Sequence, residues 1–147
     1  MKTLLSLLVF LTFIFNISCT SDTVEQEKSR LMNAIQGQWL STTYSGGIGG
    51  LPETPVTDKQ VLEFSDNMYK VYDYNKEDDS LDPKFESPYY IDYRKSELND
   101  SYNYYLVPSI LSSRPQLAIS ISGDKLYVTH DVVDGLTTVY EPYHRTL

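Results

Sequence analysis

The chain has 147 residues, of which 41% are hydrophobic, 13% aromatic and 22% charged, so a single domain with a packed core is expected. Seven glycines and seven prolines exclude a collagen-like or proline-rich fibre. Twenty acidic against twelve basic residues give a formal net charge of −8, which repels phosphate backbones and argues against a nucleic-acid partner.

The first 18 residues are typical of a secretory signal peptide. Lys2 precedes an uncharged, mainly apolar run from Leu4 to Phe15, and the small Ser18 comes directly before Cys19. The alternative is a transmembrane helix, but crossing a bilayer takes about 20 apolar residues and this run is much shorter.

Cys19 is the only cysteine, so no disulfide can form within one chain. The segment Asn16-Ile17-Ser18-Cys19 resembles the lipobox of bacterial lipoproteins, although Asn16 stands where leucine is usual. This resemblance implies that Cys19 is acylated and that residues 19–36 tether the protein to the bilayer, as in an outer membrane lipoprotein facing the periplasm or the cell surface. The alternative is an ordinary cleaved signal that leaves a free cysteine.

A short amphipathic helix is predicted next. Val24, Leu31, Met32 and Ile35 share one helical stripe, and Gly37 ends the pattern. The helix either packs against the following domain or forms a stiff spacer.

From Gly37 onward the hydrophobic pattern has period two and is rich in Tyr, Val, Ile and Thr, which predicts strands. The predicted strands are Gln38–Tyr44, Gln60–Phe64, Met68–Tyr74, Tyr89–Arg94, Tyr102–Val107, Gln116–Ser122, Lys125–Val133 and Leu136–Tyr143. About eight antiparallel strands with one apolar face indicate an all-β, up-and-down barrel over residues 37–147, with a sandwich as the alternative.

Three short turns are predicted between these strands. They are Ser65-Asp66-Asn67, Gly123-Asp124 and Asp134-Gly135, and the last is expected to be a type I′ turn with positive φ at both residues. Two longer loops are predicted at residues 45–59 and 75–87.

Gly37-Gln38-Trp39, between the helix and the first strand, resembles the Gly-x-Trp signature of the lipocalin and calycin group. In that group the tryptophan closes one end of the barrel beneath a basic side chain from the last strand region, and Arg145 stands where that cation is expected. The resemblance covers residue 37 to the C-terminus. It implies an eight-stranded, lipocalin-like barrel in a lipoprotein of Gram-negative bacteria.

The residues that carry metal and catalytic chemistry are scarce. Only His130 and His144 could join a zinc site, and Cys19 is assigned to the anchor. Residues 73–84 lack the glycine and the final glutamate of a calcium loop, which leaves adventitious calcium binding as the alternative. His130 shares an alternating face with apolar residues, which is more typical of a structural histidine than of a catalytic one. We therefore expect no enzymatic activity, no metal site and no cofactor.

The thirteen tyrosines are the unusual feature of the composition. If their strand faces line a barrel lumen, Tyr72, Tyr93 and Tyr104, together with His130, would offer apolar walls with polar groups for a small hydrophobic or glycan-like ligand. The alternative interpretation is that tyrosine packs well on any strand face.

Two functions follow as hypotheses. The first is a lipid-anchored barrel that binds a small molecule. The second is an inhibitor or immunity-type lipoprotein whose acidic residues attract a basic target protein. The acidic residues that gather in one predicted loop are Glu77, Asp78, Asp79 and Asp82. A wide apolar lumen favours the first hypothesis, whereas a filled barrel favours the second.

Overall fold

The computed structural model of the protein describes residues 22–111 and 116–144, and in these ranges it contains one helix, over residues 22–34, and nine strands. The strands are β1 (Gly37–Gly46), β2 (Leu51–Pro55), β3 (Gln60–Ser65), β4 (Met68–Asn75), β5 (Ser80–Lys95), β6 (Tyr102–Pro108), β7 (Leu117–Ser122), β8 (Lys125–His130) and β9 (Leu136–Pro142). The predicted helix and all eight predicted strands are present, and β2 is additional.

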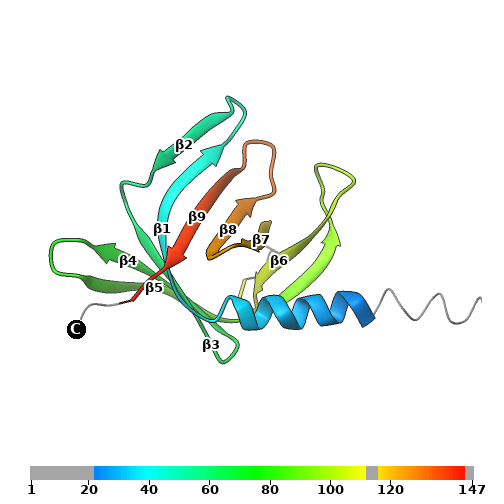
Figure 1. Cartoon of the computed structure of the whole chain (residues 1–147), viewed down its shortest axis with the longest axis horizontal. Helices are drawn as coiled ribbons and strands as arrows, with labels where there is room; N and C mark the ends of the chain where they lie inside the picture. The colour runs from blue at the N-terminus through cyan, green and yellow to red at the C-terminus, as the bar shows by residue number, and fades with distance from the viewer. Residues whose placement is uncertain (1–21, 112–115, 145–147) are drawn as a thin grey trace, which may run out of the picture.

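The strands form a closed antiparallel barrel. Strands from β3 to β9 pair in chain order, and β1 pairs with both β3 and β9, which closes a ring of eight strands. The short β2 continues the edge of β1 beyond the end of β3. In Figure 1 the helix lies across one end of the barrel, and the β1–β2 hairpin projects at the opposite end. This confirms the predicted barrel and excludes the sandwich.

Both predicted loops contain strands, so those two predictions were wrong. β2 lies within residues 45–59, and the first half of β5 lies within residues 75–87. Pro83 of β5 lies at a β-bulge, where Val71 pairs with Phe85 while Tyr72 pairs with Pro83. A bulge tolerates proline because the ladder hydrogen bonds are already interrupted there.

The predicted turns have mixed outcomes. Asp66 and Asn67 have φ of 47° and 66°, as a type I′ turn requires, and Gly123 has φ of 63° in the β7–β8 hairpin. The type I′ prediction at Asp134-Gly135 was wrong, because neither residue has positive φ. β8 ends earlier than predicted, and residues 132–135 form a turn closed by the Gly135 N–H, which donates to the Val132 carbonyl at 2.8 Å.

The barrel interior nearest the helix is filled with side chains. The Phe64 ring stacks on Tyr69 with 5.2 Å between centroids and meets the Tyr89 ring edge-on at 5.4 Å. Leu31 and Met32 of the helix pack against this core. The helix therefore covers the barrel end and is not a free spacer. The buried members of the core are Ile35, Trp39, Leu62, Phe64, Tyr69, Tyr89, Ile91, Leu106, Ile119, Leu126, Val128 and Tyr140.

Trp39 is buried where the helix meets the barrel. Gly37, with φ of 108°, turns the chain into β1, and Trp39 is only 7% exposed. The indole Nε1–H donates to the Ile35 carbonyl at 2.7 Å, while Gln36 Nε2 donates to the Tyr89 hydroxyl at 3.1 Å. The predicted burial of Trp39 at a barrel end is confirmed. Arg145 lies outside the described residues, so its place over the indole stays a prediction.

Candidate functional site

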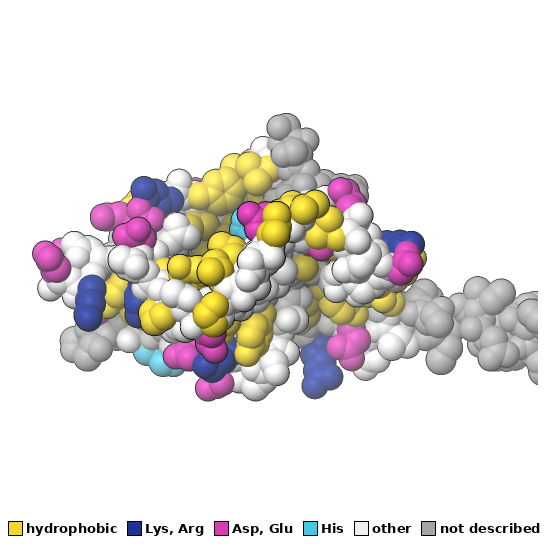
Figure 2. Space-filling view, turned by 90° about the horizontal axis from the view of Figure 1, so that it is seen from above, with side chains coloured by type: hydrophobic (Ala, Val, Ile, Leu, Met, Phe, Trp, Pro, Cys, Tyr) yellow, Lys and Arg dark blue, Asp and Glu magenta, His cyan; other side chains and the backbone are white. Residues whose placement is uncertain are grey.

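The barrel end away from the helix is hollow. Figure 2 looks onto this end and shows hydrophobic side chains gathered around a depression. A cavity of about 240 Å³, here called the mouth cavity, lies against β1 and β9. Along β9, every second residue lines the cavity: Leu136, Thr138 and Tyr140. Tyr140 belongs to the buried core, so this wall is the inner face of the barrel. The lining residues are Ser41, Tyr44, Val56, Asp58, Gln60, Leu136, Thr138 and Tyr140.

The mouth cavity combines hydroxyl groups with apolar surface. Tyr44 of β1 lies directly opposite Thr138 of β9, and Leu136 follows on the same face. The Ser41 hydroxyl accepts the Gln60 backbone N–H at 2.8 Å, which fixes the segment leading into β3 against the wall. Asp58, from the same segment, adds the one carboxylate among the lining residues.

Tyr140 forms the floor of the mouth cavity. It is 6% exposed, and burial raises the pKa of its hydroxyl to about 12. Burial, reinforced by Tyr140, also raises the pKa of Tyr69 well above the ordinary value. Both phenols therefore remain neutral at physiological pH and can donate hydrogen bonds.

These buried phenols make the protein sensitive to alkali. The stability that comes from keeping Tyr140 neutral is fully present below its ordinary pKa of about 10 and is lost as the pH rises to about 12, because the unfolded chain ionises first. The difference between the two pKa values corresponds to roughly 3 kcal/mol. Urea unfolding at a series of pH values should show this decline. Tyr140→Phe should reduce the slope of the decline, with the remainder due to Tyr69, and an unchanged slope in that variant would contradict the assignment.

The predicted ligand tyrosines of β5 and β6 lie together, but away from the mouth cavity. Tyr93 packs on Tyr104 with 4.9 Å between ring centroids and on Tyr102 with 5.4 Å. Tyr104 packs against the core and lines a groove of about 400 Å³ between the helix and the neighbouring strands, where Leu31 and Ile119 also lie. The structure therefore brings Tyr93 and Tyr104 together but gives them a packing role.

Tyr72 and His130 are not neighbours of those tyrosines. Val71 packs against the core, so the next residue, Tyr72, lies on the other face of β4. Tyr72 pairs with Val61 of β3 and lines a surface groove beside Lys70. Its predicted position in the lumen was wrong. His130 ends β8, where it pairs with Leu117 on the face that Val128 and Leu126 share, and it is exposed.

A second polar cluster lies where β6 meets β7. The backbones of these two strands pair at a single position, Tyr105 with Ala118. Side-chain hydrogen bonds supplement this pairing along the β6–β7 boundary, here called the seam. The Tyr105 hydroxyl donates to the Asp131 carboxylate, and Ser96 Oγ donates to the other carboxylate oxygen at 3.0 Å. All three of these polar residues are buried. Burial and the adjacent Asp131 raise the pKa of the Tyr105 hydroxyl.

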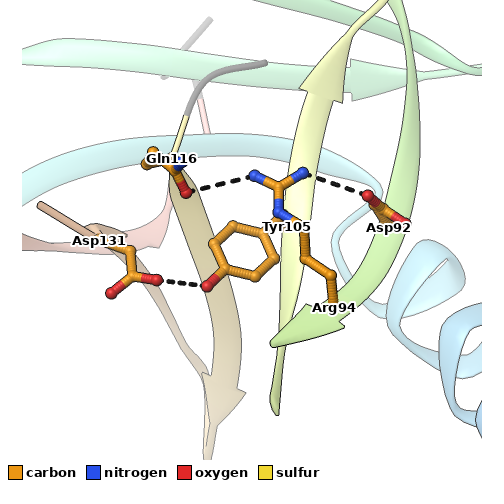
Figure 3. A network of polar contacts seen from close by, with 5 residues as sticks. All are labelled: Asp92, Arg94, Tyr105, Gln116 and Asp131. Atoms are coloured by element: carbon orange, nitrogen blue, oxygen red, sulfur yellow. Dashed lines mark hydrogen bonds and ion pairs between the residues drawn. The ribbon is translucent and has the colours of Figure 1, made fainter. Parts of the chain in front are cut away.

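Arg94 completes this cluster, which we call the polar latch (Figure 3). Its guanidinium carbon lies 4.0 Å from the centroid of the Tyr105 ring. The same guanidinium binds Asp92 at 3.1 Å and Gln116 at 3.4 Å. The polar latch joins β5 and β6 to Gln116, just before β7, and to Asp131, just after β8. It supplies hydrogen bonds at the seam between β6 and β7, where backbone pairs are few, which favours a structural role over a catalytic one.

Tyr105→Phe should weaken the barrel by about 1–3 kcal/mol, because it deprives the buried Asp131 carboxylate of a donor. Urea unfolding at neutral pH measures this loss. Tyr90→Phe, at an exposed position of β5, is the matched control and should be nearly neutral. Equal effects of the two substitutions would contradict the role of the latch.

The acidic residues near residue 80 serve the β4–β5 hairpin. Asp78 accepts the Ser80 backbone N–H at 3.1 Å, and Asp79 accepts the Tyr143 hydroxyl at 2.8 Å. Among the described residues, no group of three or more His, Cys, Asp and Glu side chains is placed to hold a metal ion. In the same part of the chain, no helix is long and apolar enough to cross a membrane.

The comparisons with known proteins were negative. A scan against family models, a search of curated proteins and a search of solved structures each found no match. The predicted lipidation site, Cys19, lies outside the described residues.

The residues that line the mouth cavity were missed by the sequence analysis. Thr138 could have been found, because it alternates with Leu136 and Tyr140 along a predicted strand. Tyr44 could not, since a register shift between Ser41 and Thr43 places Ser41 and Tyr44 on one face although they are three residues apart. No pattern in the amino-acid sequence predicts that shift.

Proposed function

We propose that this protein is a lipid-anchored envelope binding module with a lipocalin-like barrel, which holds a small amphipathic ligand in its mouth cavity. The observation that carries the proposal is the mouth cavity itself, at the open end of a barrel whose other end is filled around Trp39. The Gly37 and Trp39 signature and the position of Cys19 after an apolar run support the lipocalin-like and lipoprotein parts of the proposal.

The size of the mouth cavity limits the ligand. Pockets for drug-sized molecules are typically about 300–1,000 Å³, whereas this cavity has about 240 Å³. It suits a molecule of about one ring, such as a monosaccharide, and is too small for a long acyl chain. Below it, the described core residues fill the barrel interior around Phe64, Tyr69 and Tyr89.

The chemistry of the lining sets the ligand class. Tyr44, Thr138 and Gln60 offer hydroxyl and amide groups, and Leu136 offers an apolar surface. Such a mixture fits a ring with hydroxyl groups on its edge and C–H groups on its face. Asp58 and the net charge of −8 disfavour an anionic ligand. The expected ligand is therefore a neutral or cationic sugar-like molecule.

A titration panel tests this function. We expect a neutral or amino-substituted monosaccharide to bind the full-length protein and fatty acids not to bind, with isothermal titration calorimetry as the measurement. Thr138→Val should weaken binding about fivefold, as expected for the loss of one hydrogen bond of about 1 kcal/mol. The affinity of a neutral monosaccharide should change little with salt, because its contacts with the lining involve no pair of opposite charges.

Tyr93→Ala is the matched control for Tyr44→Ala. Both substitutions remove one partly buried tyrosine, but only Tyr44 lines the mouth cavity. Tyr44→Ala should abolish sugar binding, whereas Tyr93→Ala should leave it unchanged. The reverse pattern, or the absence of binding across the panel, would overturn the proposed function. Metabolic labelling with a fatty acid tests the anchor at Cys19 separately.

A further inference from the structure

Two hairpin tips at the open end of the barrel are joined to each other. The backbone N–H of Ile48, in the β1–β2 tip, donates to Asp134 Oδ1 at 2.7 Å, and the Gly47 N–H donates to the Gly135 carbonyl at 3.1 Å. Asp134 and Gly135 belong to the β8–β9 turn. These hydrogen bonds hold segments that are far apart in the chain as one preorganised surface.

This joined tip carries large aliphatic side chains in contact with solvent. Ile48 and Val133 are each 77% exposed, Leu51 is 49% exposed and Val132 is 46% exposed. Turns of this kind are normally built from Gly, Asn, Asp, Ser and Pro, and contiguous exposed apolar residues mark interaction surfaces. We call these four residues the apolar tip.

The two segments that form the apolar tip carry acidic but no basic side chains. Residues 44–58 and 130–139 contain no lysine or arginine. Among their acidic residues, Glu53, Asp58 and Asp134 are exposed. The apolar tip is therefore bordered by carboxylates on the two segments that form it.

The geometry points to the apolar tip as a docking surface for the apolar face of an amphipathic, basic segment of another protein. Lysine or arginine beside the partner's apolar face would complement Glu53 and Asp134, while its aliphatic side chains would cover Ile48 and Val133. A second copy of this chain would bring the same carboxylates to the contact, and an anionic membrane would repel them. The apolar tip also lies at the barrel end opposite the helix, which is part of the proposed tether, so it points away from that attachment (Figure 1).

Synthetic peptides test this inference directly. The probe is a fluorescent amphipathic helical peptide with a leucine stripe flanked by lysines, and its matched counterpart carries glutamates in place of the lysines. We expect the lysine peptide to bind the full-length protein in fluorescence anisotropy, and binding to weaken at least tenfold when salt rises from about 0.01 to 0.15 M. On binding, backbone amides of residues 46–51 and 132–135 should gain protection from hydrogen exchange.

Substitutions distinguish binding at the apolar tip from nonspecific binding to exposed hydrophobic side chains. The double variant Ile48→Ser/Val133→Ser should weaken peptide binding more than tenfold. The control is Leu98→Ser/Ile110→Ser, which removes two exposed aliphatic side chains elsewhere, with 47% and 61% exposure, and should leave binding unchanged. Equal loss in both double variants, or equal binding of the glutamate peptide, would overturn the inference.

Two further measurements exclude the other occupants. Sedimentation equilibrium should show the same mass for the wild type and the tip variant, and a dimer lost in the tip variant would overturn the inference in favour of a second copy. Binding to phosphatidylcholine vesicles, with and without anionic lipid, should be equal in the two proteins, and a loss in the tip variant would assign the apolar tip to a membrane. The tip variants leave the mouth cavity unchanged, so failure of this inference is distinguishable from failure of sugar binding.

Discussion

Gly135→Ala should lower the free energy of unfolding more than any other substitution of a glycine at the open end of the barrel. A Cβ atom at residue 135 would lie 1.6 Å from the His130 carbonyl oxygen and 2.8 Å from its carbon, because the turn of residues 132–135 folds back over the end of β8. That overlap is with backbone and cannot be relieved by rotating a side chain. We expect a loss of about 4 kcal/mol or more in the free energy of unfolding, measured with urea.

Gly49→Ala is the matched control for this substitution. Gly49 lies in the neighbouring β1–β2 tip, its φ is not in the left-handed region, and no atom lies within 4 Å of the position of an added Cβ. Its replacement should be neutral or slightly stabilising, because alanine lowers the entropy of the unfolded chain. Asp134→Asn should also be nearly neutral, since an amide oxygen can still accept the Ile48 N–H. Equal tolerance at residues 49 and 135 would contradict the observed turn.

Trp39→Ala should cost about 3–5 kcal/mol of unfolding free energy, as for other truncations of large aromatic residues in a core. The indole is 7% exposed, and its Nε1–H donates to the carbonyl of Ile35, the residue that directly follows the helix. Loss of the side chain therefore removes core volume and also releases the helix. Thermal unfolding measures the first effect, and hydrogen exchange of residues 22–34 measures the second.

Trp39→Phe separates these two contributions. Phenylalanine retains an aromatic ring but cannot donate to the Ile35 carbonyl, so exchange in the helix should rise while most of the barrel stability remains. Because Trp39 is the only tryptophan, the emission maximum of the native protein reports its environment directly and should be blue-shifted. A red-shifted, solvent-like maximum in the folded protein would contradict the packing of this barrel end.

The strands were predictable because their signal is local. In Leu117–Ser122 and Lys125–His130, alternation places Ile119, Leu126 and Val128 on the side that forms the core. The helix stripe was equally local, and Leu31, Met32 and Ile35 all contact the core as expected. The loops were less predictable, since residues of types common in loops occur over 45–59 and 75–87, although β2 and the first half of β5 lie there.

The candidate site was much less predictable. The ligand residues expected from tyrosine content were Tyr72, Tyr93 and Tyr104, but the mouth cavity is lined by Tyr44 and Tyr140. Strand alternation predicts which residues share a face within one strand. It does not predict which face points into the barrel after a register shift. The shift between Ser41 and Thr43 determines this for Tyr44.

The sequence by itself determined the all-β class, the strand order along the chain, the covering helix and the burial of Trp39, because period-two and helical patterns are properties of neighbouring residues. Only the tertiary structure decided how the ring closes between β1 and β9, where the mouth cavity lies, and that the tips at Ile48 and Val133 meet. These features depend on contacts between residues far apart in the chain, such as Ile48 and Asp134, which are 86 positions apart. Local propensity carries no information about such contacts, because they arise from barrel closure and from the register of the pairing strands.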